Sequence, residues 1–94
     1  MIKSFKCKET AKIFRRERSY KFSMDIQKIA LRKITMIHAA ISIEDLRIPP
    51  GNHLELLKGN RKGQHSIRIN NQWRICFIWN KNDALEVEII DYHK

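Results

Sequence analysis

The chain has 94 residues, of which 43% are hydrophobic, and 19 lysines and arginines against 10 acidic residues give it a formal charge of +9. This length and composition predict a single folded domain over residues 1–94, and they exclude a second hydrophobic core and a disordered chain. The charge favours a polyanionic partner, which is either nucleic acid or an anionic membrane surface.

The sequence also bears on where the protein acts. No stretch approaches the roughly 20 apolar residues of a membrane span. Lys3, Lys6 and Lys8 interrupt the N-terminus before any apolar run, which argues against a signal peptide. Cys7 and Cys76 each lie beside an apolar pattern and are expected to be reduced thiols. We therefore expect a cytoplasmic protein with no membrane contact.

The N-terminal part of the chain is expected to be mainly helical. Residues 1–7 fit a short edge strand, and residues 8–17 fit a short helix. A basic cluster at the end of that helix either complements the helix dipole or contacts a nucleic-acid backbone, and it comprises Arg15, Arg16, Arg18 and Lys21. Residues 23–41 predict the clearest helix, because Ser23 can cap it and Asp25 suits its first turn.

The long helix has an apolar stripe that is expected to pack on a sheet. The stripe consists of Ile26, Ile29, Ala30, Ile34, Ile37 and Ile41. Lys28, Arg32 and Lys33 lie off the stripe and are expected to face solvent. One further helical turn fits residues 42–45, and the prolines of residues 49–52 then end regular structure.

The C-terminal half is expected to form strands. Residues 53–57 fit a short strand with Leu54 and Leu56 inward, and a basic loop follows over residues 58–63. Residues 64–79 predict a β-hairpin that turns at Asn70 and Asn71. Its inward face comprises Ile67, Ile69, Trp73, Ile75, Phe77 and Trp79. A last strand over residues 85–90 has an inward face of Leu85, Val87 and Ile89.

This order of elements predicts an α+β fold, in which two N-terminal helices cover one face of a mainly antiparallel sheet of about four strands. The opposite face is then open. Alternation places on that face Arg68, Arg74, Tyr92, His53 and Glu55. Two arginines on an open sheet face in a basic chain form a candidate phosphate site.

Three functions fit such a face. The first is metal-independent RNA cleavage, which needs a base for the 2′-hydroxyl, cations for the charge developing on phosphorus, and an acid for the leaving 5′-oxygen. Glu55 or Asp91 are candidates for the base and His93 for the acid. The cation candidates are Lys58, Arg68 and Arg74.

The second function is metal binding, because His53 and Glu55, like Asp91 and His93, lie two residues apart on one strand face. The surrounding positive charge argues against a bound cation. The third is a noncatalytic nucleic-acid-binding module in which Trp73 and Trp79 stack on bases. Their position on the apolar face favours the core instead.

The chain resembles the HigB toxins, the host-inhibition branch of the RelE-like toxin superfamily. The resemblance rests on Pro49-Pro50-Gly51-Asn52-His53-Leu54-Glu55, on the pattern G-x-R-x-G-x-x-S-I-x-x-x-x-x-W-R from Gly59 to Arg74, and on the ending Asp91-Tyr92-His93. It implies a ribosome-dependent endoribonuclease that cuts mRNA in the A site without a metal cofactor and leaves a 2′,3′-cyclic phosphate and a 5′-hydroxyl. The implied partners are the ribosome, a HigA-type helix-turn-helix antitoxin, and operator DNA through the antitoxin complex.

The resemblance also implies roles for individual residues. Lys58 matches a basic residue near the scissile phosphate, and Arg74 matches the active-site arginine of the superfamily. Asp91, Tyr92 and His93 match the C-terminal catalytic cluster, in which His93 is the expected acid or base.

One position departs from the family. Glu55 stands where the better-known HigB branch has a histidine, and whether His53 substitutes for that histidine stays open. The residues expected to bind RNA without taking part in the chemistry are Arg61, Lys62, Arg68 and His53. The runner-up function is a noncatalytic, basic nucleic-acid-binding partner in an operon repressor complex.

Overall fold

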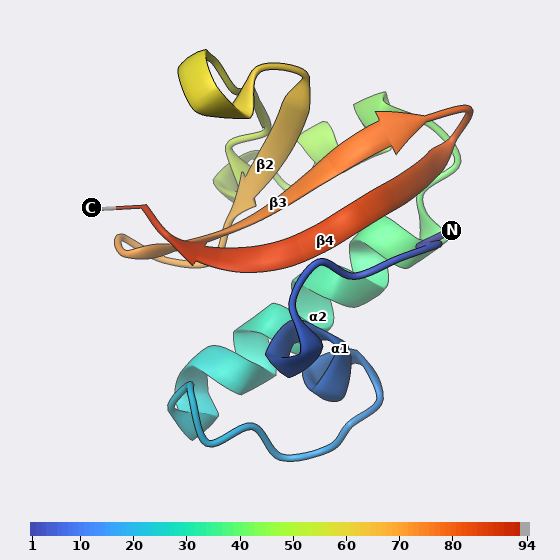
Figure 1. The fold of residues 1–94 in the computed structure, drawn as a ribbon. Helices are drawn as coiled ribbons and strands as arrows, with labels where there is room; N and C mark the ends of the chain where they lie inside the picture. Colours follow the sequence, from blue (N-terminus) through green and yellow to red (C-terminus); the bar gives the residue numbers. More distant parts are fainter. Residues whose placement is uncertain (93–94) are drawn as a thin grey trace.

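A computed structural model describes residues 1–92 and has the predicted α+β architecture (Figure 1). Two helices lie on one side of a sheet of four strands: α1 (Lys8–Phe14), α2 (Met24–Ala39), β1 (Glu55–Leu56), β2 (Gln64–Arg68), β3 (Trp73–Asn80) and β4 (Asp83–Asp91). Three short 3-10 helices lie in the connections: η1 (Ile43–Arg47), η2 (Pro50–Asn52) and η3 (Gly59–Arg61). Within residues 1–92, no helix is long and apolar enough to cross a membrane.

The sheet is antiparallel throughout, with the strands in the order β1-β2-β3-β4. The segment before α1 lies along the outer edge of β4 without forming the strand expected over residues 1–7. It makes two isolated parallel bridges, from Ile2 to Ala84 and from Phe5 to Val87. These bridges cover the edge of β4, so its backbone groups are not left open to another chain.

The long helix packs on the sheet through the predicted stripe. Ser23 caps it, because its Oγ accepts the backbone N–H of Ile26 at 3.3 Å. Ala30, Ile34 and Ile37 are completely buried against the sheet. The prediction that Ile41 continues the stripe is wrong, because the helix ends at Ala39 and Ile41 is 75% exposed.

The expectation that Lys33 faces solvent is also wrong. Its side chain is only 6% exposed, and its Nζ donates a hydrogen bond to Oδ1 of the fully buried Asn52. Asn52 Nδ2 donates in turn to the Leu46 carbonyl at 3.1 Å. The connection after α2 therefore folds back over a helix face that periodicity alone assigns to water.

The predicted β2–β3 hairpin forms, and it keeps the predicted faces, because Ile67 lies opposite Ile75 and Arg68 lies opposite Arg74. The last strand departs from simple alternation at a β-bulge, because Cys76 pairs with Glu88 whereas Ile78 pairs with Leu85. The extra residue lies on β4, where Glu86 adopts a left-handed φ of 55°.

The bulge changes which residues of β4 face the helices. Ala84, Val87 and Ile89 are buried in the core. The prediction that Leu85 points inward is wrong, because Leu85 shares the face of Ile78, on the other side of the sheet. A single extra residue in β4 moves the side chains that precede it to the opposite face of the sheet.

The first strand is shorter than the predicted 53–57. His53 has a left-handed φ of 45°, and β1 pairs with β2 only at Glu55 and Leu56. The prediction that Leu56 points inward is wrong, because Leu56 is 60% exposed while Leu57 is buried. Regular alternation does not extend along a two-residue edge strand, so it misassigns these leucines.

Candidate active site on the open sheet face

Arg74 is a buried charged side chain that several hydrogen bonds hold in place on the open face. Its Nε donates to Ser66 Oγ at 2.8 Å, and its Nη2 donates to the His53 carbonyl at 2.5 Å. Nη2 also lies 3.5 Å from Glu55 Oε1. The side chain is only 7% exposed. The guanidinium group is therefore held in one orientation by contacts from β1, β2 and the connection before β1.

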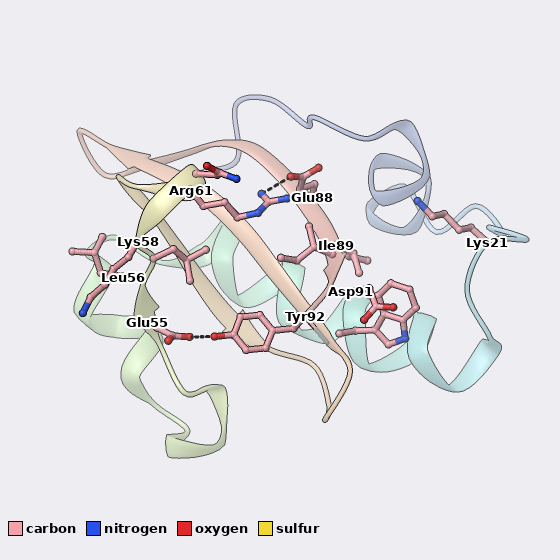
Figure 2. Close-up of a pocket in the computed structure, with 13 residues that line it drawn as sticks. Lys21, Glu55, Leu56, Lys58, Arg61, Glu88, Ile89, Asp91 and Tyr92 are labelled. Atoms are coloured by element: carbon pink, nitrogen blue, oxygen red, sulfur yellow. Dashed lines mark hydrogen bonds and ion pairs between the residues drawn. The ribbon is translucent and has the colours of Figure 1, made fainter. Parts of the chain in front are cut away.

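Tyr92 and Glu55 complete the surroundings of this arginine. The Tyr92 ring lies over the guanidinium, with 5.1 Å between the ring centroid and Cζ. The Tyr92 hydroxyl donates to Glu55 Oε1 at 3.4 Å (Figure 2). Glu55 is thus shared by a cation and a phenol, and its side chain remains 45% exposed. The result is a fixed cation beside an accessible carboxylate.

A cleft of about 1040 Å³ lies beside this group, between β1, η3 and the C-terminal half of β4 (Figure 2). The predicted site residues that line it are Glu55, Lys58, Arg61, Asp91 and Tyr92. Lys21, from the loop between the two helices, lines the cleft as well. The cleft therefore collects side chains from widely separated parts of the chain.

Two of these lining residues are held by partners that sequence reasoning missed. Arg61 Nη1 donates to Glu88 Oε1 at 2.8 Å and to Gln64 Oε1 at 3.2 Å. Asp91 Oδ2 accepts from Gln72 Nε2 at 3.1 Å. Much of the charge of Arg61 is therefore offset within the protein.

A smaller hollow adjoins the cleft and shares two residues with it. It is lined by His53, Leu54, Glu55, Arg68, Arg74 and Tyr92. Arg68 is held towards the β2–β3 turn, because its Nε donates to the Asn70 carbonyl at 3.1 Å and its guanidinium contacts Asn71 Oδ1. His53 is exposed, and its backbone rather than its ring contacts Arg74.

Eight of the ten predicted site residues line one of these two hollows. Lys62 is exposed and lines neither of them. His93, the predicted acid or base, lies outside the described residues. Ser66 is a site residue that sequence reasoning missed, although alternation places it on the face of Arg74. Only the strand register reveals that its hydroxyl contacts that arginine.

The sheet face that carries Arg74 also carries a buried thiol that stays protonated at neutral pH. Cys76 pairs with Ser66 across β2 and β3, and its side chain is completely buried. Burial raises the pKa of its thiol to about 11. The neutral thiol is a poor nucleophile, so Cys76 is a packing residue.

The alternative of a metal site involves His93, which lies outside the described residues, and it can be compared with the structure only for the remaining candidates. Within residues 1–92, no three His, Cys, Asp or Glu side chains gather closely enough to hold an ion. His53 and Glu55 lie beside Arg74 instead, and a cation there would meet its positive charge. The arrangement suits an anion better.

Comparisons with known proteins agree with this geometry. Residues 3–93 match the family described as "RelE-like toxin of type II toxin-antitoxin system HigB". The chain belongs to the HigB family of RelE-like toxins. Toxin HigB-1 of Vibrio cholerae serotype O1 is 46% identical over 69 residues, which cover 73% of this chain and 72% of that protein. An uncharacterized protein of Haemophilus influenzae is 41% identical over 64 residues, which cover 68% and 63% of the two chains.

The fold of this HigB-family chain is also found in solved structures. The crystal structure of YafQ from E. coli strain BL21(DE3) superposes with a TM-score of 0.61 at 12% identity, over 99% of this chain and 93% of that one. The crystal structure of a YafQ mutant from E. coli gives a TM-score of 0.60 at 11% identity over the same shares. These matches confirm the RelE-like fold. As a member of a type II system, the toxin has an antitoxin as its partner.

Proposed function

We propose that this toxin is a ribosome-dependent mRNA endoribonuclease that cuts in the A site by metal-independent acid–base chemistry. The observation that carries the proposal is the fixed Arg74 guanidinium, held beside the accessible Glu55 carboxylate and the Tyr92 hydroxyl at the edge of an open cleft. A phosphodiester that enters the smaller hollow would meet a preoriented cation and a base together.

The proposed reaction transfers two protons. Glu55 takes the proton of the 2′-hydroxyl while the 2′-oxygen attacks phosphorus. The bond between phosphorus and the 5′-oxygen then breaks. Arg74 and Lys58 stabilise the additional negative charge on the phosphoryl oxygens. His93 protonates the departing 5′-oxygen, as the family resemblance implies. The products are a 2′,3′-cyclic phosphate and a 5′-hydroxyl.

The remaining predicted residues receive supporting roles. Tyr92 orients Glu55 through their hydrogen bond, and Asp91 acts within the C-terminal cluster. The residues proposed to hold the RNA backbone are Arg61, Lys62, Arg68 and His53. The proposed partners are the ribosome with bound mRNA, a HigA-type helix-turn-helix antitoxin, and operator DNA through the antitoxin complex. Because its proposed substrate is mRNA on translating ribosomes, the toxin would act in the cytoplasm.

Mapping of 5′-hydroxyl RNA ends across the transcriptome tests the proposal. After induction of the wild-type toxin, we expect new ends inside translated regions, in register with codons. Arg74→Ala should produce almost none, because it removes the buried guanidinium beside Glu55, and Arg68, the other cation that lines the smaller hollow, is held towards the β2–β3 turn. Arg32→Ala, on the exposed side of α2, is the matched control and should cut like the wild type.

Copurification with the antitoxin checks that each variant is folded. If growth stops without codon-phased ends, the proposed cleavage is wrong, and the noncatalytic nucleic-acid-binding function becomes the better explanation. Such a binder would instead lose function gradually over many Lys and Arg substitutions.

A further inference from the structure

The loop between α1 and α2 has an unusual composition that the proposed reaction does not use. Residues 15–21, which we call the α1–α2 arm, contain one acidic residue and four basic ones: Arg15, Arg16, Arg18 and Lys21. Between the cations lies Tyr20, whose side chain is 86% exposed. A tyrosine side chain this exposed contributes little to the stability of the fold, because an aromatic ring stabilises a protein mainly through its burial.

The arm is nevertheless held firmly at its centre. Ser19 is almost completely buried. Its backbone N–H donates to Gln27 Oε1 at 3.1 Å, and its carbonyl accepts from Gln27 Nε2 at 2.6 Å. Its Oγ donates to Glu9 Oε1 at 2.7 Å. Both helices therefore fix the residue directly before Tyr20, and the exposed ring projects from an anchored backbone.

Two cations of the arm, Arg18 and Lys21, lie against this ring and towards the cleft, respectively. Arg18 Cζ lies 5.0 Å from the centroid of the Tyr20 ring, which is a cation–π contact. This contact places a positive charge beside the exposed aromatic ring. Lys21 lines the cleft together with Trp73, Asp91 and Tyr92 (Figure 2). The arm therefore adjoins the cleft at Lys21.

We propose that the α1–α2 arm is a second binding surface for single-stranded RNA, in which the Tyr20 ring stacks on a base and Arg18 and Lys21 bind phosphates. An exposed aromatic ring between cations fits RNA, whose bases supply flat apolar faces and whose backbone supplies negative charge at each step. The inference rests on the proposed function only in placing RNA in the adjoining cleft. Because Tyr20 is so exposed, its substitution should not affect folding.

The test measures binding separately from cleavage. The probe is a fluorescent single-stranded RNA with every ribose 2′-O-methylated, which cannot be cut because no 2′-hydroxyl proton remains. We expect Tyr20→Ala to weaken binding about 5- to 150-fold, the range for loss of one stacked base. Tyr20→Phe keeps the ring and should bind like the wild type. Thermal unfolding by circular dichroism verifies that each variant is folded.

The salt dependence of binding tests the role of Lys21. Lys21→Gln should reduce the slope of log affinity against log salt by about 0.7, the value for one phosphate contact on a single strand. Lys81→Gln is the matched control, because Lys81 lies in the β3–β4 turn, at the opposite end of these strands from Trp73 and Asp91. It should leave the slope unchanged.

Three results would overturn the inference. The first is wild-type toxin that does not bind the probe, and the second is Tyr20→Ala that binds as tightly as the wild type. The third is Tyr20→Ala that loses the antitoxin while it retains RNA, which would make the arm a protein-binding surface. Absence of codon-phased cleavage would refute the proposed reaction alone, because the binding assay involves no cleavage.

Discussion

Arg74 is held by acceptors on two separate segments of the chain. Ser66 supplies a hydroxyl from β2, and His53 supplies a carbonyl from the connection before β1. The two bonds leave from different nitrogens of a planar group, Nε and Nη2. A lysine ammonium concentrates its donors on one atom and cannot reach both acceptors in the same way. The orientation therefore depends on the guanidinium shape as well as on charge.

At this scale we predict that Arg74→Lys reduces the cleavage rate at saturating substrate by about 100-fold or more, the usual effect of losing one preoriented donor to a developing anion. The assay is cleavage of mRNA on programmed ribosomes, and Arg32→Lys is the control. A rate within a fewfold of the wild type would mean that charge alone suffices and that the hydrogen bonds to Ser66 and His53 are irrelevant to catalysis.

At the scale of elements, local pattern predicts α2 and the β2–β3 hairpin well. Both depend on periodicity and on residues next to one another in sequence, such as the Ser23 cap. Local pattern misses the bulge in β4, because Glu86 carries no sequence signal for its positive φ. It misses the burial of Lys33, because that burial depends on a connection that begins several residues later in the chain.

In the candidate site, too, local pattern predicts some features and misses others. Alternation indicates that Arg68 and Arg74 share a face, and the register confirms this. It does not reveal that Arg74 is buried, or that Ser66, Gln72 and Glu88 bind the charged residues around them. Those contacts depend on which strands are neighbours and on where β1 ends, and neither follows from the composition of a single strand.

The connection between α2 and η2 gives a prediction about stability. Burial lowers the pKa of Lys33, with a further contribution from Arg32, so the ammonium depends on its acceptor Asn52. Asn52→Leu should destabilise the protein by roughly 3–5 kcal/mol, because it leaves a buried charge without a partner. Lys33→Met combined with Asn52→Leu removes both polar groups and should recover much of that loss.

Urea unfolding of the wild type, both single variants and the double variant completes this cycle. The expected result is strong coupling, in which the double variant loses much less stability than the sum of the two single losses. If the two single losses simply added, Lys33 and Asn52 would contribute independently. The hydrogen bond between Lys33 and Asn52 would then not be the contact that holds η2 and His53 against α2.

At the scale of the whole molecule, the charge of +9 has two consequences of opposite sign. Like charges repel one another in the compact state, which lowers stability when little salt is present. The same charges attract the phosphates of RNA, and this attraction also weakens as salt is added. Salt therefore relieves a cost of folding and removes a driving force for binding.

We predict that raising sodium chloride from about 50 to about 500 mM increases the free energy of unfolding modestly while it weakens association with ribosomes steeply, because the Debye length shrinks over this range. Urea unfolding and cosedimentation with ribosomes in the same buffers measure the two quantities. The antitoxin complex serves as a comparison in the cosedimentation assay, since bound antitoxin changes the exposed charge. Ribosome association that stayed constant across this range would show that contacts other than phosphate contacts hold the toxin on the ribosome, and the open face would then lose its role as the RNA-binding surface.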